Sequence, residues 1–187
     1  MEALVPAFIA ALLTQLGDRP AMLTAIVADR YGRPLTAAFA AGLAHGVGNL
    51  VAALAGGTMT PLLTPNAQAL FLAVALFIGG VSALWPVKPP ARLDGWRLGA
   101  LLTAFLGVFS LAFGGQTHFF TLAFAARGEP LFAAAGATAG AFAVAFVAAV
   151  LGELAWMRIP FRGFRILTGI LFLVAAAVIG LGAVRLL

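Results

Sequence analysis

Two short groups of polar residues interrupt an otherwise apolar sequence. Their carboxylate, amide and hydroxyl oxygens are ligands that hard cations such as calcium and manganese take, whereas an imidazole suits softer transition metals. A carboxylate or an imidazole inside a membrane can also carry a proton. These side chains therefore favour an ion pathway, and all of them except the guanidinium are candidate metal ligands. The groups are Gln15, Asp18 and Arg19, and Gln116, Thr117 and His118.

Two further polar residues, His45 and Asn49, are four residues apart and so share one face of a helix. His45 is either a proton relay or a histidine hydrogen-bonded to a neighbouring helix. Asn49 is expected to hydrogen-bond between helices. Both are included in the candidate ion pathway. Asp18 and Arg19 have a second interpretation as a structural or hydrated ion pair.

Catalytic patterns are absent from the sequence. It contains no cysteine, which excludes disulfides, thiolate metal sites and thiol nucleophiles. No glycine-rich phosphate loop, Ser-His-Asp set or zinc-helix motif is present. We expect that the protein is not an enzyme and that it holds no resident cofactor.

The composition is that of an integral membrane protein. Of 187 residues, 63% are hydrophobic and 9% are charged, whereas soluble domains carry about 25% charged residues. A bilayer solvates apolar side chains, so lipid is the expected partner. The formal charge of +5 does not indicate nucleic-acid binding, because the basic residues fall mostly in short connections.

Six apolar stretches are each long enough to cross a bilayer, which takes about 20 residues. The predicted fold is all-α, with six transmembrane helices in a single domain over residues 1–187. A proline-rich linker at about 86–97 divides it into repeat one, about 1–86, and repeat two, about 98–187. The stretches cover about 4–28, 35–57, 67–85, 98–126, 131–155 and 164–184.

Basic residues favour one orientation of the six helices. Eight lie in the connections after the first, third and fifth stretches, and only Arg127 and Arg185 belong to the other side. The positive-inside rule predicts a cytoplasmic-membrane protein, of bacterial type, with both termini outside. Glu153 is expected to pair with Arg158 at the interface, and a homo-oligomer is possible. The eight are Arg30, Arg33, Lys88, Arg92, Arg97, Arg158, Arg162 and Arg165.

The two halves of the sequence are similar to each other. Gly17 corresponds to Gly114, Thr24 to Thr121 and Pro34 to Pro130. Three helices in each half would give the halves opposite orientations in the membrane. Inverted repeats with a site at their interface are typical of secondary transporters. The two polar groups would then meet near the middle of the membrane.

Both polar groups resemble the E-x-G-D-[KR]-[ST] motif of the GDT family of manganese and calcium transporters. The resemblance implies exchange of metal for protons at a site built from two Glu and two Asp. In the first copy Gln15 replaces Glu, Asp18 is kept, Arg19 keeps the base and Pro20 replaces Ser or Thr. In the second copy Thr117 is kept, while Ala112, Gly115, Gln116 and His118 stand where the family has Glu, Asp, a base and Gln.

These departures change the charge of the implied site. The family's acids give a net negative charge that suits a divalent cation, whereas here Asp18 and Arg19 cancel. We expect a proton-coupled transporter of a manganese- or calcium-like divalent cation with an altered site. The alternatives are a non-transporting membrane subunit and an exporter of another small solute.

Overall fold

The computed structural model describes residues 2–184, and every regular element within them is helical. Four helices are long, and four shorter helices form two consecutive pairs. A single 3-10 turn, η1 (Thr60–Leu62), joins α3 to α4. The long helices are α3 (Pro34–Met59), α4 (Pro65–Leu84), α7 (Pro130–Arg158) and α8 (Phe161–Ala183). The shorter ones are α1 (Leu4–Gln15), α2 (Arg19–Tyr31), α5 (Gly99–Ala112) and α6 (Gln116–Ala125).

Several of these helices are able to cross a membrane. The four long helices have the required length and hydropathy, and α5 with α6 makes a fifth if the pair is one broken span. With only 12 residues, α1 is shorter than a span. The structure thus establishes four or five candidate spans among the described residues, and the predicted count of six is not confirmed.

The expected first and fourth helices are each broken in two. Gly17 and Gly114 both adopt φ +72°, a left-handed conformation that ends the preceding helix and that glycine adopts without strain. The α5 and α6 axes differ in direction by 69°. Hydropathy averaged over a window reports apolar character but no backbone dihedral, so the sequence predicted continuous helices here.

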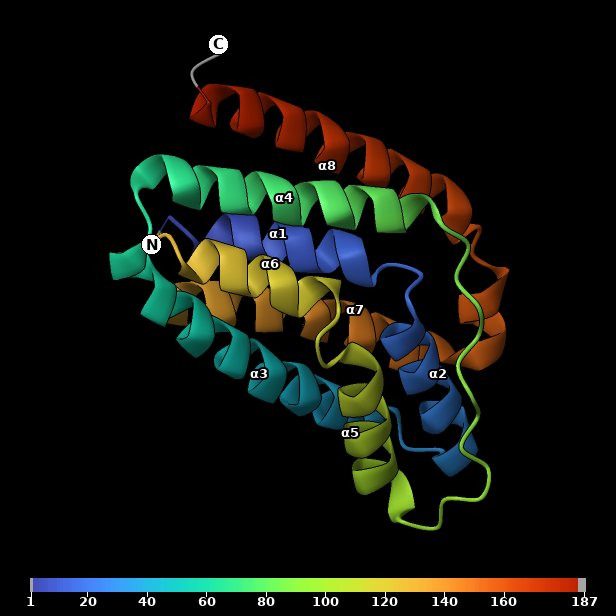
Figure 1. Ribbon diagram of the computed structural model, residues 1–187. Helices are drawn as coiled ribbons and strands as arrows, with labels where there is room; N and C mark the ends of the chain where they lie inside the picture. The colour runs from blue at the N-terminus through green and yellow to red at the C-terminus, as the bar shows by residue number, and fades with distance from the viewer. Residues whose placement is uncertain (1, 185–187) are drawn as a thin grey trace.

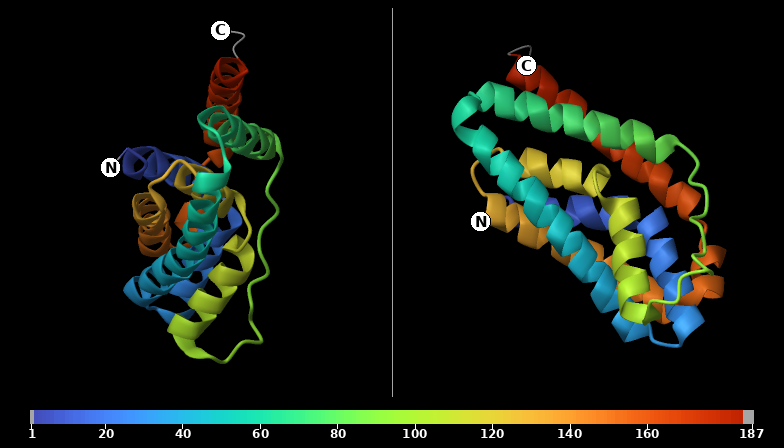
Figure 2. Two further views of the ribbon diagram at one scale, coloured as in Figure 1. Left: turned by 60° about the vertical axis from the view of Figure 1, so that its left-hand side comes forward. Right: turned by 60° about the horizontal axis from the view of Figure 1, so that its bottom comes forward.

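The two halves of the chain pack across each other rather than side by side. Helices α1 and α2 pack on α7, while α5 and α6 pack on α3, and α3 and α7 contact each other. Helices α4 and α8 form a separate pair (Figure 1). The linker between α4 and α5 follows one end of the molecule without regular structure (Figure 2).

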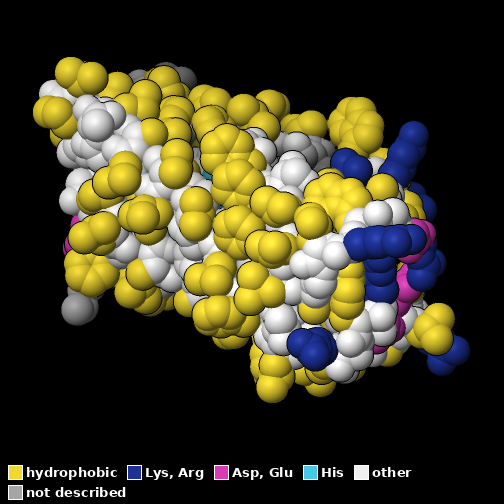
Figure 3. Space-filling model, turned by 90° about the horizontal axis from the view of Figure 1, so that it is seen from below, with side chains coloured by type: hydrophobic (Ala, Val, Ile, Leu, Met, Phe, Trp, Pro, Cys, Tyr) yellow, Lys and Arg dark blue, Asp and Glu magenta, His cyan; other side chains and the backbone are white. Residues whose placement is uncertain are grey.

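Small residues allow the central helices to approach closely. A Cβ at Gly136 would overlap the Leu4 carbonyl oxygen, and one at Gly140 would overlap the Phe8 carbonyl oxygen. Helices α1 and α7 therefore pack backbone against backbone, as small residues permit in membranes. Larger apolar side chains point outward and cover the flank of the molecule (Figure 3).

Basic residues gather at one end of the molecule (Figure 3). The connections that carry them contact one another: Arg30 donates hydrogen bonds to the carbonyl oxygens of Leu93, Asp94 and Trp96. Arg165 donates to the carbonyl oxygens of Ser82 and Trp85. At the other end, where α1 begins and α8 ends (Figure 1), Glu129 accepts a hydrogen bond from the Ala3 backbone.

The predicted pairing of Glu153 with Arg158 is wrong. Glu153 Oε2 is 2.6 Å from Arg92 Nη2, an ion pair with the linker. Residues five apart do not face each other on a helix, and α7 is also distorted at Gly152, where φ is 74° and ψ is 174°. The Glu153 backbone N–H donates to the Asp29 carboxylate at 2.7 Å, which joins α7 to the end of α2.

Candidate functional site

The end of α1 meets the beginning of α6 inside the protein. Gln15, the last residue of α1, donates from Nε2 to Thr117 Oγ1 at 2.9 Å. Thr14 Oγ1 lies 3.2 Å from the same Thr117 oxygen. All three side chains are buried. The contact exists because both helices stop or start at a break, so one member of each sequence group reaches the other.

From Thr117 the hydrogen bonds continue into α3 and α7. Thr121 Oγ1 donates to the Asn49 side-chain oxygen at 2.9 Å and also bonds to the Thr117 carbonyl. Asn49 Nδ2 donates to Thr138 Oγ1 at 3.2 Å. Asn49 thus makes the interhelical hydrogen bonds expected of it. The network connects four helices, α1, α6, α3 and α7, through neutral side chains.

The two histidines lie next to this network. The ring centroids of His45 on α3 and His118 on α6 are 6.3 Å apart. Both rings are buried. His45 Nδ1 and at least one nitrogen of His118 have no hydrogen-bond partner in the described structure, while the Ala112 carbonyl lies close enough to act on the His118 ring. A Cβ at Gly48 would overlap the His118 ring, so this glycine creates the space that the ring occupies. We refer to Gln15, Thr117, His118, His45 and Asn49 as the polar cluster.

Asp18 lies at the break between α1 and α2 and faces a different neighbour. It is half-buried, and it interacts with the Arg19 backbone N–H and with the guanidinium groups of Arg165 and Arg19. Arg19 itself is exposed. No ion pair within 4 Å joins Asp18 to Arg19 among residues 2–184. Arg165 of α8, at the basic end of the molecule, is thus the charge on another helix that acts on the carboxylate, and the Asp18 backbone N–H donates to the Gln15 carbonyl at 3.1 Å.

The breaks themselves border cavities. Gly17 lines a space of about 460 Å³ with Trp156, Phe161 and Arg165. Gln116, half-buried, lines one of about 390 Å³ against α4 together with Gly114 and Gly115. Five of the eight predicted site residues thus form the polar cluster, while Asp18, Arg19 and Gln116 lie at its margins.

Sequence reasoning missed three threonines of the network: Thr14, Thr121 and Thr138. Thr14 precedes Gln15, and Thr121 follows Thr117 by one helical turn, so their positions were a usable indication. Nothing in the sequence near Thr138 pointed to this role, because its hydrogen bond depends on how α7 packs against α3.

A family comparison accounts for this arrangement. The model of the divalent cation/proton antiporter GDT1 family matches residues 3–90 and again residues 100–185. The chain belongs to this family. Between them the two matches leave residues 91–99 unmatched, which are the last part of the linker and the first residue of α5. Comparison with curated proteins and with solved structures found no match.

Membership of the GDT1 family makes this chain an integral membrane protein of a transporter family, in agreement with its apolar spans. The family resemblance predicted from the two motif copies is confirmed. The described residues contain no group of three or more His, Asp or Glu side chains able to hold a metal ion. Any cation in the polar cluster would therefore be bound mainly by neutral oxygens and imidazole nitrogens.

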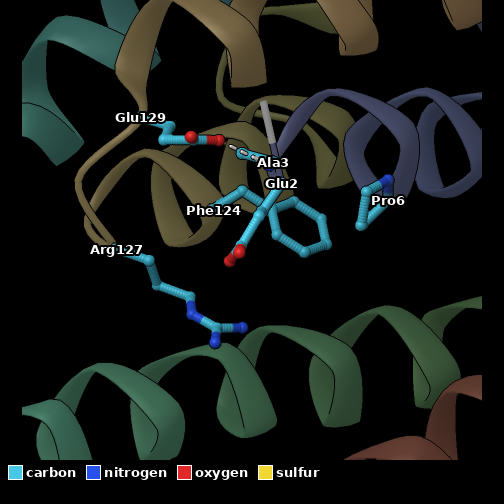
Figure 4. Close-up of a pocket in the computed structure, with 6 residues that line it drawn as sticks. All are labelled: Glu2, Ala3, Pro6, Phe124, Arg127 and Glu129. Carbon is cyan, nitrogen blue, oxygen red and sulfur yellow. Dashed lines mark hydrogen bonds between the residues drawn. The ribbon is translucent and has the colours of Figure 1, made fainter.

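The GDT1-family chain also has a polar cavity at the end opposite the basic residues (Figure 4). Its volume is about 330 Å³, and Glu2, Arg127 and Glu129 line it with Ala3, Pro6 and Phe124. Between it and Gln15, α1 presents buried alanines, among them Ala7, Ala10 and Ala11, so the route inward is packed with small side chains.

Proposed function

We propose that this protein exchanges a divalent metal cation, manganese- or calcium-like, for protons, and that its altered cation site is the polar cluster. The observation that carries the proposal is the hydrogen bond of 2.9 Å between Gln15 and Thr117. It joins the two helix breaks, and family membership supplies the class of cargo. Transporter sites typically form where broken helices meet at a repeat interface.

Broken helices provide backbone groups that a continuous helix would use internally. α1 and α5 end at the breaks and α2 and α6 begin there, so carbonyl oxygens at the first two helix ends lose intrahelical donors and can accept from a ligand. The Asp18 and Gly115 N–H groups donate back to the Gln15 and Ala112 carbonyls. In this proposal a cation uses the side-chain oxygens of Gln15 and Thr117, and the family's lost carboxylates lower its affinity. Gln116 remains a candidate ligand that would need a movement of α6.

We also propose that the halves are inverted repeats. Matching φ values at Gly17 and Gly114 support this, as does the exchanged packing of α1–α2 on α7 and of α5–α6 on α3. With Pro34 aligned to Pro130, the equivalents of His45 and Asn49 are Ala141 and Ala145, both buried. The polar side chains of α3 thus have no counterparts on α7, and in this proposal the cation passes along the α3 side of the pseudo-symmetric core.

Asp18 is proposed as the proton-coupled group. It is the acid that the chain retains from the family motif, and Arg165 is an opposite charge on another helix that acts on it. A carboxylate that alternates between this guanidinium and a proton can couple proton movement to the position of α8. The positive charges of Arg19 and Arg165 would also repel a cation for as long as the Asp18 carboxylate is protonated and cannot offset them.

The test is metal-dependent proton flux in reconstituted vesicles with an internal pH-sensitive dye. Manganese and calcium are supplied outside, against a proton gradient. We expect either metal to accelerate dissipation of the gradient, and Asp18→Asn to abolish the effect. Asp94→Asn, which removes an exposed linker acid, is the matched control and should transport normally. Elution position in size-exclusion chromatography verifies that each variant folds.

Two results would contradict the proposal. If correctly folded wild-type protein gives no metal-dependent proton flux, the alternative of a non-transporting subunit or of another solute is favoured. If Asp18→Asn transports like Asp94→Asn, the carboxylate has no coupling role and the proton must be carried elsewhere.

A further inference from the structure

The chain contains only two histidines, and the fold places both in the same buried space. Their ring centroids are 6.3 Å apart, and the rings are 1% and 5% exposed. His45 Nδ1 and at least one nitrogen of His118 have no hydrogen-bond partner in the described part of the chain, and the Ala112 carbonyl can accept from the other His118 nitrogen. Buried polar atoms are normally paired, because an unpaired one costs about 1–3 kcal/mol. The unpaired nitrogens are therefore available to a ligand.

The helices hold the two rings in this arrangement with specific neighbours. His45, Gly48 and Asn49 share one face of α3, and α6 lies against that face. The missing Cβ of Gly48 leaves room for the His118 ring beside α3. Asn49 and Thr117 are fixed by their own hydrogen bonds, so polar oxygens of known position flank the imidazoles.

We propose that His45 and His118 together bind one borderline transition-metal ion of the zinc, cobalt or nickel class, in preference to calcium or manganese. The proposal rests on the proposed function in taking the polar cluster as the cation site, and it changes the expected cargo from a manganese- or calcium-like cation to a borderline metal. Neutral imidazole is a good ligand for these metals and a poor one for hard cations. The cluster lacks the carboxylates that hard cations need.

The geometry is compatible with a shared ion. Bonds of roughly 2.1 Å from one metal to two imidazole nitrogens put the ring centroids about 5–6.5 Å apart, depending on the angle at the metal. The observed 6.3 Å lies at the wide end of that range. A small closing movement of α6 toward α3 would bring the rings to a tetrahedral angle, with Thr117 or water as further ligands.

Because there are two histidines and no cysteine, the experiment has little background. Full-length protein without a histidine tag, labelled with ¹⁵N in histidine, is titrated with zinc chloride in detergent micelles. We expect both imidazole signals to shift together and to saturate at one zinc per chain. Calcium and manganese at the same concentration should compete weakly or not at all for the bound zinc. His45→Gln and His118→Gln should each weaken zinc binding at least about tenfold.

A backbone variant keeps both imidazoles and tests their placement. Gly48→Ala should displace the His118 ring and weaken zinc binding, whereas Gly46→Ala on the same helix introduces only an ordinary contact with Thr138 and should bind normally. A shift of one histidine alone, or zinc affinity unchanged in both glutamine variants, would overturn the shared site.

Equilibrium binding does not require transport, so the two proposals fail separately. Zinc binding as expected, without proton flux in vesicles supplied with zinc, manganese or calcium, would refute the antiport and leave the histidine site intact. Proton-coupled metal flux without any shift of the histidine signals would refute the histidine site and leave the antiport intact.

Discussion

Gln15 and Thr117 are 102 residues apart in the chain, yet the side-chain amide of one donates a 2.9 Å hydrogen bond to the hydroxyl of the other. Each residue lies at a helix break, and each belongs to a different half of the sequence. The contact thus links the two family motif copies through neutral groups, where the full motif would pair a Glu at position 15 with the same hydroxyl. Its consequences for transport and stability can be tested.

Replacing the acceptor should disrupt this junction. Thr117→Val keeps the side-chain shape but removes the oxygen that pairs with Gln15 and Thr14. The buried Gln15 amide then lacks its partner, so we expect a loss of about 1–3 kcal/mol in unfolding free energy and strongly reduced flux. Thermal unfolding in micelles and vesicle flux measure the two effects.

The matched control is Thr103→Val, another buried threonine, which contacts the Tyr31 hydroxyl at 3.2 Å outside the polar cluster. This variant should lose some stability and keep its flux. If Thr117→Val transports at the same rate as Thr103→Val, the junction has only a structural role.

Restoring one family acid should shift the metal preference. Gln15→Glu is nearly isosteric and puts a carboxylate beside Thr117, where the family motif has Glu. An opposite charge at about 4 Å contributes on the order of 4 kcal/mol at a dielectric constant of 20, partly offset by desolvation. We therefore expect the half-saturating manganese or calcium concentration to fall by about tenfold or more.

Gln68→Glu provides the same chemical change at a distance, because Gln68 on α4 hydrogen-bonds the Thr60 and Leu63 carbonyls. It should leave the concentration dependence of flux unchanged. An equal shift in both variants would mean that general surface charge is responsible, and the polar cluster would no longer be the cation site.

The kink in α7 requires glycine. Gly152 has φ 74° and ψ 174°, a region populated essentially by glycine, and a Cβ there would also overlap the Asp29 carboxylate. We expect Gly152→Ala to destabilise the fold by about 1–3 kcal/mol from backbone strain alone. The thermal unfolding temperature in micelles measures this, with Gly163→Ala on α8 as the control.

Gly163 is helical, and a Cβ there meets no atom within 4 Å, so alanine should be neutral or slightly stabilising. Equal unfolding temperatures for the two alanine variants would show that α7 tolerates a straight path at this point.

Orientation can be tested because the chain has no native cysteine. Gly95 lies exposed in the linker at the basic end, and Asn66 lies exposed at the start of α4, at the opposite end. With the basic end in the cytoplasm, a membrane-impermeant maleimide should label Asn66→Cys in intact cells. Gly95→Cys should react only after permeabilisation, and the reverse pattern would invert the proposed orientation.

The sequence alone determined the environment of this protein and its class. Abundant apolar residues and scarce charges specify a bilayer, because only lipid solvates such a surface, and the two motif copies indicated the family. The separation of basic connections from the termini also followed from the sequence, since alternate connections of crossing helices must lie at opposite ends. The left-handed conformations of Gly17 and Gly114 were not predicted, because a glycine's φ depends on the packing around it.

Only the tertiary structure decided which polar residues meet. It joined Gln15 to Thr117, it brought the His45 and His118 rings together, and it exposed the Asp18 carboxylate to the charge of Arg165. It also added Thr138, a residue that no local pattern distinguishes. The physical reason is that side-chain hydrogen bonds act over about 3 Å, so partners a hundred residues apart depend on helix packing that periodicity and composition do not encode.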